Sequence, residues 1–123
     1  MEFVKDEIFR VNKLDYSDNL IKADLSINPK SPIFKGHFPG QPVVPGACIL
    51  QIVKEVVEDA LGLPLQLKKA SQLKFIAMLD PVKTISVQLE MSYKLNEDEI
   101  SFTGNLSNID KIYFKFQGTF TES

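Results

Sequence analysis

The only histidine of the chain, His37, lies in a stretch, residues 36–46, that is rich in glycine and proline. This stretch holds three of the six glycines and three of the seven prolines. Proline fixes φ and lacks an amide donor, whereas glycine permits close approaches that other residues do not. The alternation predicts a stiff, specifically shaped loop. An imidazole titrates near physiological pH, so His37 is a candidate general base; the alternative is a loop histidine without chemistry.

The loop reads Gly36-His37-Phe38-Pro39-Gly40, then Pro42 and the pair Pro45-Gly46. This order of residues resembles the motif of the 3-hydroxyacyl-[acyl carrier protein] dehydratases, a family with the hot-dog fold. It implies an α+β chain in which an antiparallel sheet wraps around one long central helix. Outside the motif the match is to the pattern of strands. We therefore expect a single hot-dog domain over residues 1–123.

Composition agrees with one compact domain and excludes several classes of protein. A chain of 123 residues with 44% hydrophobic residues can form a core, and its net charge of −2 does not favour nucleic acid or an anionic membrane. The N-terminus is charged from its second residue, and no segment is apolar for long enough to span a bilayer. One cysteine cannot form an internal disulfide, which agrees with a reducing compartment. We expect a cytoplasmic protein.

Hydrophobic periodicity predicts one helix followed and preceded by strands. A helix is expected over residues 47–61, because its apolar residues recur at helical spacing and Gly62 follows where helices commonly end. Alternating apolar and polar residues predict the strands. The expected strands are residues 7–16, 21–27, 66–76, 85–95, 100–106 and 112–120.

The predicted helix is apolar over more than half of its circumference, so it should be largely buried. Its polar stripe consists of Lys54, Glu55, Glu58 and Asp59, with Gln51 in the middle. One helix covers one face of a sheet, and in hot-dog proteins a second subunit supplies further cover. The resemblance therefore implies a homodimer or a dimer of dimers, with His37 of one chain near Gln51 of the other.

The resemblance also assigns roles. His37 would remove the α-proton of a 3-hydroxyacyl thioester, and the backbone N–H groups at the helix start would polarise the thioester carbonyl. The family supplies the proton for the leaving hydroxyl from a Glu or Asp five residues after the second Pro-Gly glycine, where this chain has Gln51. The residues expected to bind substrate are Phe38, Gly40, Pro45, Gly46, Ala47 and Cys48.

Gln51 leaves three hypotheses open, because a side-chain amide is not a general acid. In a dehydratase with a modified site, His37 handles both proton transfers and Gln51 positions the leaving hydroxyl. In a thioesterase, Gln51 holds the water that attacks the thioester. In a partner subunit, the chain binds an acyl group without chemistry. Glu55, one helical turn further on, is the nearest carboxylate that could substitute, but we expect it at the solvated end of the stripe.

The remaining reactive groups point to no further chemistry. Cys48 has no second histidine to activate it, so we expect it to line the pocket. The sequence contains no metal-ligand cluster and no phosphate-binding glycine loop, so no cofactor is implied. The acyl group would arrive on acyl carrier protein or on coenzyme A. Lys68, Lys69 and Lys74 are candidate contacts for an acidic carrier protein.

Overall fold

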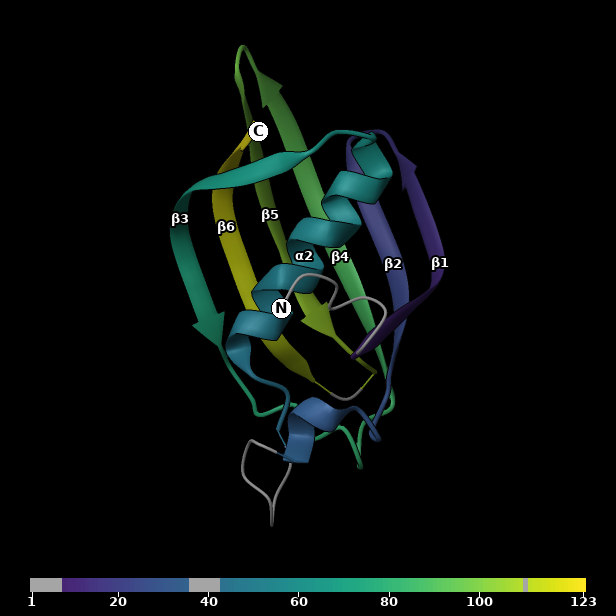
Figure 1. Ribbon diagram of the computed structural model, residues 1–123. Helices are drawn as coiled ribbons and strands as arrows, with labels where there is room; N and C mark the ends of the chain where they lie inside the picture. Colours follow the sequence, from purple (N-terminus) through teal and green to yellow (C-terminus); the bar gives the residue numbers. More distant parts are fainter. Residues whose placement is uncertain (1–7, 36–42, 110) are drawn as a thin grey trace.

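The computed structural model describes residues 8–35, 43–109 and 111–123. This part of the chain forms six strands, one α-helix and one short 3-10 helix (Figure 1). In chain order they are β1 (Phe9–Ser17), β2 (Leu20–Ile27), η1 (Pro32–Lys35), α2 (Gly46–Leu61), β3 (Leu65–Phe75), β4 (Ser86–Asn96), β5 (Glu99–Ser107) and β6 (Ile112–Glu122). The predicted helix and all six predicted strands are confirmed; η1 was not predicted.

The six strands form one antiparallel sheet in the order β1-β2-β4-β5-β6-β3. β1 and β3 are its edges, and α2 lies across the inner face of the curved sheet (Figure 1). The two tight turns, β1–β2 and β4–β5, lie at the end of the sheet where α2 finishes. The longer connections lie at the end where α2 begins. The sheet wrapped around one helix is therefore confirmed.

Strand alternation decides which side chains meet the helix. In β4, Val87, Leu89 and Met91 are buried, while the intervening Gln88 and Glu90 are exposed on the outer face. The alternation predicted that the whole strand 85–95 would follow this pattern. Its two ends do not: Ile85 is 62% exposed and Leu95 is 66% exposed. Both lie at the limits of the strand, where α2 no longer covers the sheet.

The turn between β1 and β2 consists of two residues with positive φ, Asp18 at 50° and Asn19 at 62°. Two-residue hairpin turns of this kind match the natural twist of paired strands, and Asp and Asn tolerate the conformation better than most residues. The sequence therefore fixes the register of β1 against β2 locally.

Helix α2 packs on a core rich in phenylalanine. The rings of Phe102, Phe114, Phe116 and Phe120 are buried in the sheet, and neighbouring pairs have centroids 5.3–6.3 Å apart. Apolar residues of α2 cover them, which buries large apolar surface and provides the main stabilisation of the fold. Within the described ranges, no helix is long and apolar enough to cross a bilayer.

Candidate functional site

The N-terminus of α2 is open to an acceptor from outside the helix. Pro45 is the N-cap residue, and no side chain in the described ranges caps the helix. The carbonyl of Pro45 accepts from the N–H groups of Cys48 at 3.0 Å and Ile49 at 3.2 Å. By helix geometry, the N–H groups of Gly46 and Ala47 have no acceptor within the helix. The helix dipole adds partial positive charge at this point, and no acidic residue of the first turn opposes it.

An apolar hollow of about 440 Å³ adjoins this helix start. It is formed where the segment before α2 meets the connection between β3 and β4. A hydrogen bond from the N–H of Val44 to the carbonyl of Leu79, 2.9 Å, joins these two segments. The hollow is lined by Val43, Val44, Gly46, Ile49, Phe75, Ile76, Ala77, Met78 and Leu79. Such a lining suits an aliphatic chain.

Gly46 lies close against the side chain of Phe75. A Cβ atom on Gly46 would lie 2.8 Å from Cζ and 2.9 Å from Cε1 of Phe75, closer than carbon atoms approach without displacement. The Phe75 ring also packs against Phe114, with centroids 4.9 Å apart, yet Phe75 remains 53% exposed. The ring therefore packs against the start of α2, lines the hollow and remains half exposed to solvent.

The structure brings only part of the predicted substrate-binding set to this hollow. Gly46 lines it, and Pro45 caps the helix beside it. Ala47 is exposed, whereas Cys48 is only 2% exposed and belongs to the core; neither residue is part of the lining. The predicted site residues His37, Phe38 and Gly40 lie outside the described residues.

Gln51 is partly buried on α2, on the side that faces away from the sheet. Successive residues of an α-helix are turned by about 100°, so Gln51 projects about 160° away from Ile49, which lines the hollow. Within one chain, Gln51 therefore does not contact the apolar hollow.

Glu55 corrects the expectation that it lies at the solvated end of the polar stripe, because it is only 6% exposed. The physical reason is its position on the helix wheel. Glu55 and the buried Cys48 are seven residues apart and project within about 20° of each other. Glu55 thus belongs to the flank of α2 that is buried. It also projects about 180° from Gly46, so it lies on the side of the helix opposite the hollow.

Residues 75–79 form much of the lining of the hollow, but they were not identified from the sequence as part of a candidate site. A signal was present: Phe75-Ile76-Ala77-Met78-Leu79 is a run of five apolar residues that breaks the alternation of the preceding strand. A run of this kind at the end of an edge strand indicates an apolar surface that β pairing does not use.

Comparison with solved structures identifies the fold. The dehydratase heterocomplex ApeI:P from Xenorhabdus doucetiae contains a chain similar to this one, with a TM-score of 0.74 and 18% identity over 91% of this chain and 96% of that chain. The putative thioesterase yhdA from Lactococcus lactis has a TM-score of 0.70 and 8% identity over 99% of this chain and 98% of that one. The six-stranded sheet around α2 is the hot-dog fold, as predicted.

Sequence relatives give the family. The 3-hydroxyacyl-[acyl-carrier-protein] dehydratase FabZ of Xanthomonas euvesicatoria is 31% identical over 74 residues, which are 60% of this chain and 49% of that protein. FabZ of Haemophilus influenzae is 32% identical over 71 residues, 57% of this chain and 47% of the relative. The matches thus span about half the length of these relatives. A family model described as ApeI-like, ApeI dehydratase, matches residues 13–116, so the chain belongs to the ApeI-like dehydratase family.

Proposed function

We propose that this protein is a hydro-lyase that removes water from 3-hydroxyacyl thioesters in fatty-acid or related acyl biosynthesis. The observation that carries the proposal is the apolar hollow at the uncapped start of α2. It offers an apolar wall for an acyl chain beside amide donors for a carbonyl oxygen. Membership of the ApeI-like family and similarity to FabZ support the same reaction.

In the proposed reaction the acyl chain lies in the hollow and the thioester oxygen accepts from the N–H groups of Gly46 and Ala47. These donors stabilise the negative charge of the enolate that forms when His37 removes the α-proton. The resulting imidazolium donates that proton to the 3-hydroxyl while the C–O bond breaks. Water and an enoyl thioester leave, and His37 is neutral again. The Gln51 amide holds the hydroxyl in position, since it cannot supply a proton.

We propose further that two copies complete each site. In the described part of the chain β3 pairs with β6 alone, so its other edge can accept a strand. Leu73, Phe75 and Ile76 at this edge are 40–53% exposed. Gln51 faces away from the hollow of its own chain, so a hydroxyl held by Gln51 would belong to a substrate in the hollow of a second copy. Light scattering at micromolar concentration tests this: a stable monomer contradicts a shared site.

One observation keeps a second function open. Gln51 stands where the related dehydratases have an acid, and an amide can hold a water for attack on the thioester carbon. The protein would then be a thioesterase. A protein that catalyses neither dehydration nor thioester hydrolysis would be a subunit that binds acyl groups for a catalytic partner.

The test compares wild type with His37→Ala on 3-hydroxyacyl, enoyl and saturated acyl thioesters. Wild type should interconvert the first two, measured by enoyl absorbance. His37→Ala should lower the rate by about 10²–10⁴-fold, the range for loss of a general base, with an unchanged circular dichroism spectrum. Hydrolysis without enoyl formation identifies the thioesterase instead. A wild-type rate in His37→Ala removes His37 from the chemistry.

A further inference from the structure

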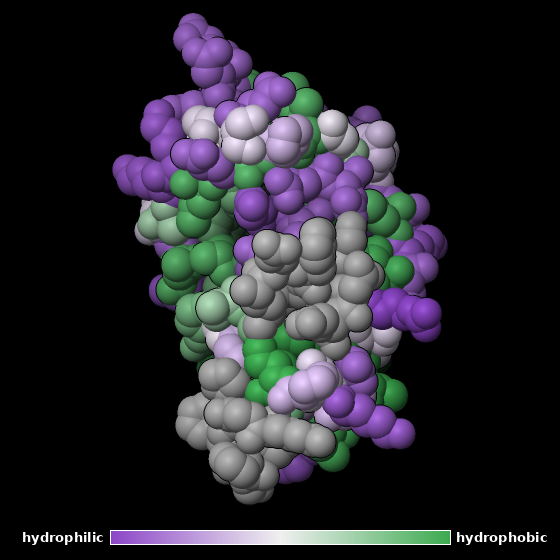
Figure 2. All heavy atoms as spheres, in the orientation of Figure 1, coloured by the Kyte–Doolittle hydropathy of each residue, from purple (hydrophilic) through white to green (hydrophobic). Residues whose placement is uncertain are grey.

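Glu55 of α2 is the only charged side chain in the described ranges that is buried, with 6% of its surface exposed. Figure 2 shows hydrophilic residues crowded at the upper end of the molecule, where α2 finishes, and a buried Glu55 adds nothing to that surface. A carboxyl group loses favourable hydration when it is buried. The position of Glu55 therefore calls for a reason in the fold or in the function.

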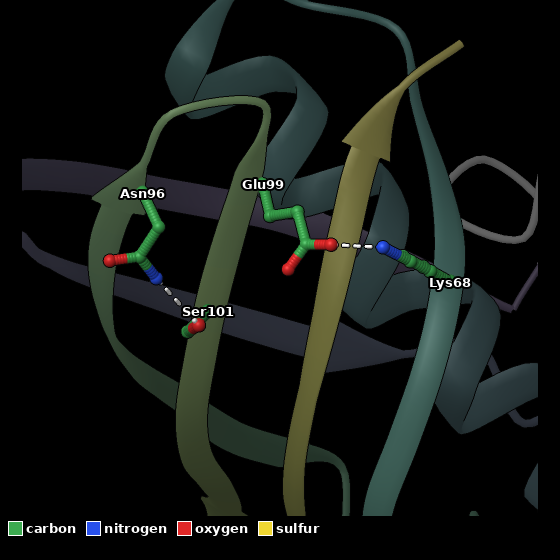
Figure 3. Close-up of polar contacts among 4 residues, drawn as sticks. All are labelled: Lys68, Asn96, Glu99 and Ser101. Carbon is green, nitrogen blue, oxygen red and sulfur yellow. Dashed lines mark hydrogen bonds and ion pairs between the residues drawn. The ribbon is translucent and has the colours of Figure 1, made fainter.

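Two other carboxyl groups show what a role in the fold looks like. Oε2 of Glu58 accepts from the N–H of Leu65 at 2.7 Å. Glu99 forms an ion pair with Lys68 of β3, which lies on the far side of β6 and which the sequence suggested as a carrier contact (Figure 3). The side chains of Glu58 and Glu99 are 25% and 37% exposed. Glu55 therefore differs from both in how far it is removed from water.

Glu55 and Gln51 lie on the same side of α2. Four residues of a helix turn through about 400°, so the two side chains project within about 40° of each other, with Cβ atoms about 5–6 Å apart. Long side chains of a helix lean toward its N-terminus and cover the turn before their own Cα. The carboxyl group of Glu55 is therefore directed toward the turn that carries Gln51. Because Gln51 is only partly buried, a substrate that meets its amide comes close to this carboxyl group.

The proposed reaction needs an acid that residue 51 does not supply. Cleavage of the C–O bond is assisted by a proton on the leaving hydroxyl, and the Gln51 amide cannot donate one. A buried carboxyl group is the kind that proteins use for this task, because desolvation disfavours its charged form. The proton can pass directly or through one water molecule. Glu55 thus offers the missing chemistry one helical turn beyond the position where the related dehydratases have an acid.

We propose that Glu55 is the general acid of the dehydration and acts on the hydroxyl that Gln51 holds. This inference rests on the proposed function and changes one of its steps. After His37 removes the α-proton, the Glu55 carboxyl group, and not the imidazolium, donates a proton to the 3-hydroxyl as the C–O bond breaks. Water leaves, Glu55 is now a carboxylate, and the imidazolium returns its proton to Glu55 through solvent. Since Gln51 faces away from its own hollow, both residues act on substrate bound by the second copy.

The first test is Glu55→Gln, which removes the ionisable group at nearly constant volume. The kcat for enoyl formation from a 3-hydroxyacyl thioester should fall about 10²-fold, the lower end of the range for loss of a general acid. KM should stay within about twofold and the circular dichroism spectrum should not change. The matched control is Glu58→Gln, which removes a carboxyl group from the same helix and should keep kcat within about twofold. No loss in Glu55→Gln, or an equal loss in the control, overturns the inference.

The second test is the exchange variant Gln51→Glu/Glu55→Gln, which moves the carboxyl group back by one helical turn. Its kcat should return at least to the wild-type level, because the acid then occupies the position used by the related dehydratases. In the Gln51→Glu background, Glu55→Gln should therefore cost less than about twofold. A residue that only supports the fold would cost the same factor in both backgrounds, and that result contradicts the inference.

The outcomes separate this inference from the proposed function. If wild type forms enoyl product and Glu55→Gln is equally active, the dehydration stands and the role of Glu55 is wrong. If wild type forms no enoyl product, the proposed function fails and Glu55 is not its acid. Should Glu55→Gln fold poorly, Glu55→Met replaces it, because an apolar side chain of similar length is well suited to a buried position. The same loss and the same rescue by Gln51→Glu are expected for Glu55→Met.

Discussion

The two ends of helix α2 differ in how their backbone groups are satisfied. At the C-terminal end, Gly62 takes the left-handed conformation with φ of 68°, and its N–H donates to the carbonyl of Glu58 at 2.8 Å. Oε2 of Glu58 accepts from the N–H of Leu65 at 2.7 Å, which starts β3. At the N-terminal end, Pro45 brings no side-chain cap from the described residues, and a hollow adjoins Gly46.

We expect the C-terminal end of α2 to contribute mainly to the free energy of unfolding and the N-terminal end mainly to the proposed activity. The closed end fixes the direction in which the chain leaves α2 for β3, and helix caps of this kind contribute to the free energy of unfolding. At the open end no side chain of the described residues caps the helix, and in the proposed function its amide groups donate to the thioester oxygen. Substitutions at the two ends should therefore change different measured quantities.

Among substitutions at the two ends of α2, the largest effect is expected for Gly46→Ala at the open end. The new Cβ would meet the Phe75 ring at 2.8 Å, and this half-exposed ring can move aside more easily than the helix. Displacing it changes the lining of the hollow, so kcat/KM for dehydration should fall by up to about 10²-fold, the cost of misplacing a substrate. The free energy of unfolding should change by less than about 1 kcal/mol, since alanine favours the helix.

Gly62→Ala is the matched control at the closed end. No atom lies within 4 Å of a Cβ at this position, but alanine is strained at a φ of 68°. The free energy of unfolding should fall by about 1 kcal/mol, with kcat/KM unchanged. The contrast between the two ends is lost if Gly46→Ala keeps full activity or if Gly62→Ala loses it.

A smaller effect, on stability alone, is expected for Glu58→Ala. This substitution removes the acceptor for the N–H of Leu65 and the contact with Lys54, whose Nζ lies 4.0 Å from Oε2. Hydrogen bonds to charged groups contribute about 1.5–3 kcal/mol, less where solvent is near, so denaturant unfolding should show a loss of about 1–2 kcal/mol.

Two variants identify the source of that loss. Glu58→Gln keeps an oxygen that can accept from Leu65, so it should retain most of the stability. Lys54→Ala should cost no more than about 0.5 kcal/mol, because this ion pair is partly exposed. A Lys54→Ala variant as destabilised as Glu58→Ala would show that the ion pair, and not the cap, holds this end.

Sequence periodicity predicted the helix and the strands because burial in this fold follows local patterns. The start of α2 at Gly46 and its end before Gly62 follow from the special conformations of glycine and proline. Periodicity placed Glu55 with the solvated residues, and this was wrong, because the wheel does not show how far each flank of the helix is covered. It also did not predict the exposure of Ile85 and Leu95.

The candidate site was predictable only in part. The composition of residues 36–46 pointed to the start of α2, and Gly46 indeed lines the hollow there. The other wall is formed by residues 75–79, about 30 positions further along the chain. No local pattern links these two segments, because their contact results from the return of β3 beside the helix start. The role of His37 stays a prediction, since it lies outside the described residues.

Enoyl-thioester absorbance, recorded for wild type and Gln51→Glu in parallel, tests the central claim most directly. The exchange adds one ionisable group at nearly constant volume, so folding should barely respond. If the protein is a dehydratase with a modified site, wild type forms enoyl product, and Gln51→Glu raises the rate by about 10²-fold, the lower range for a general acid. If wild type hydrolyses thioesters and neither protein forms enoyl product, the proposed dehydration is wrong.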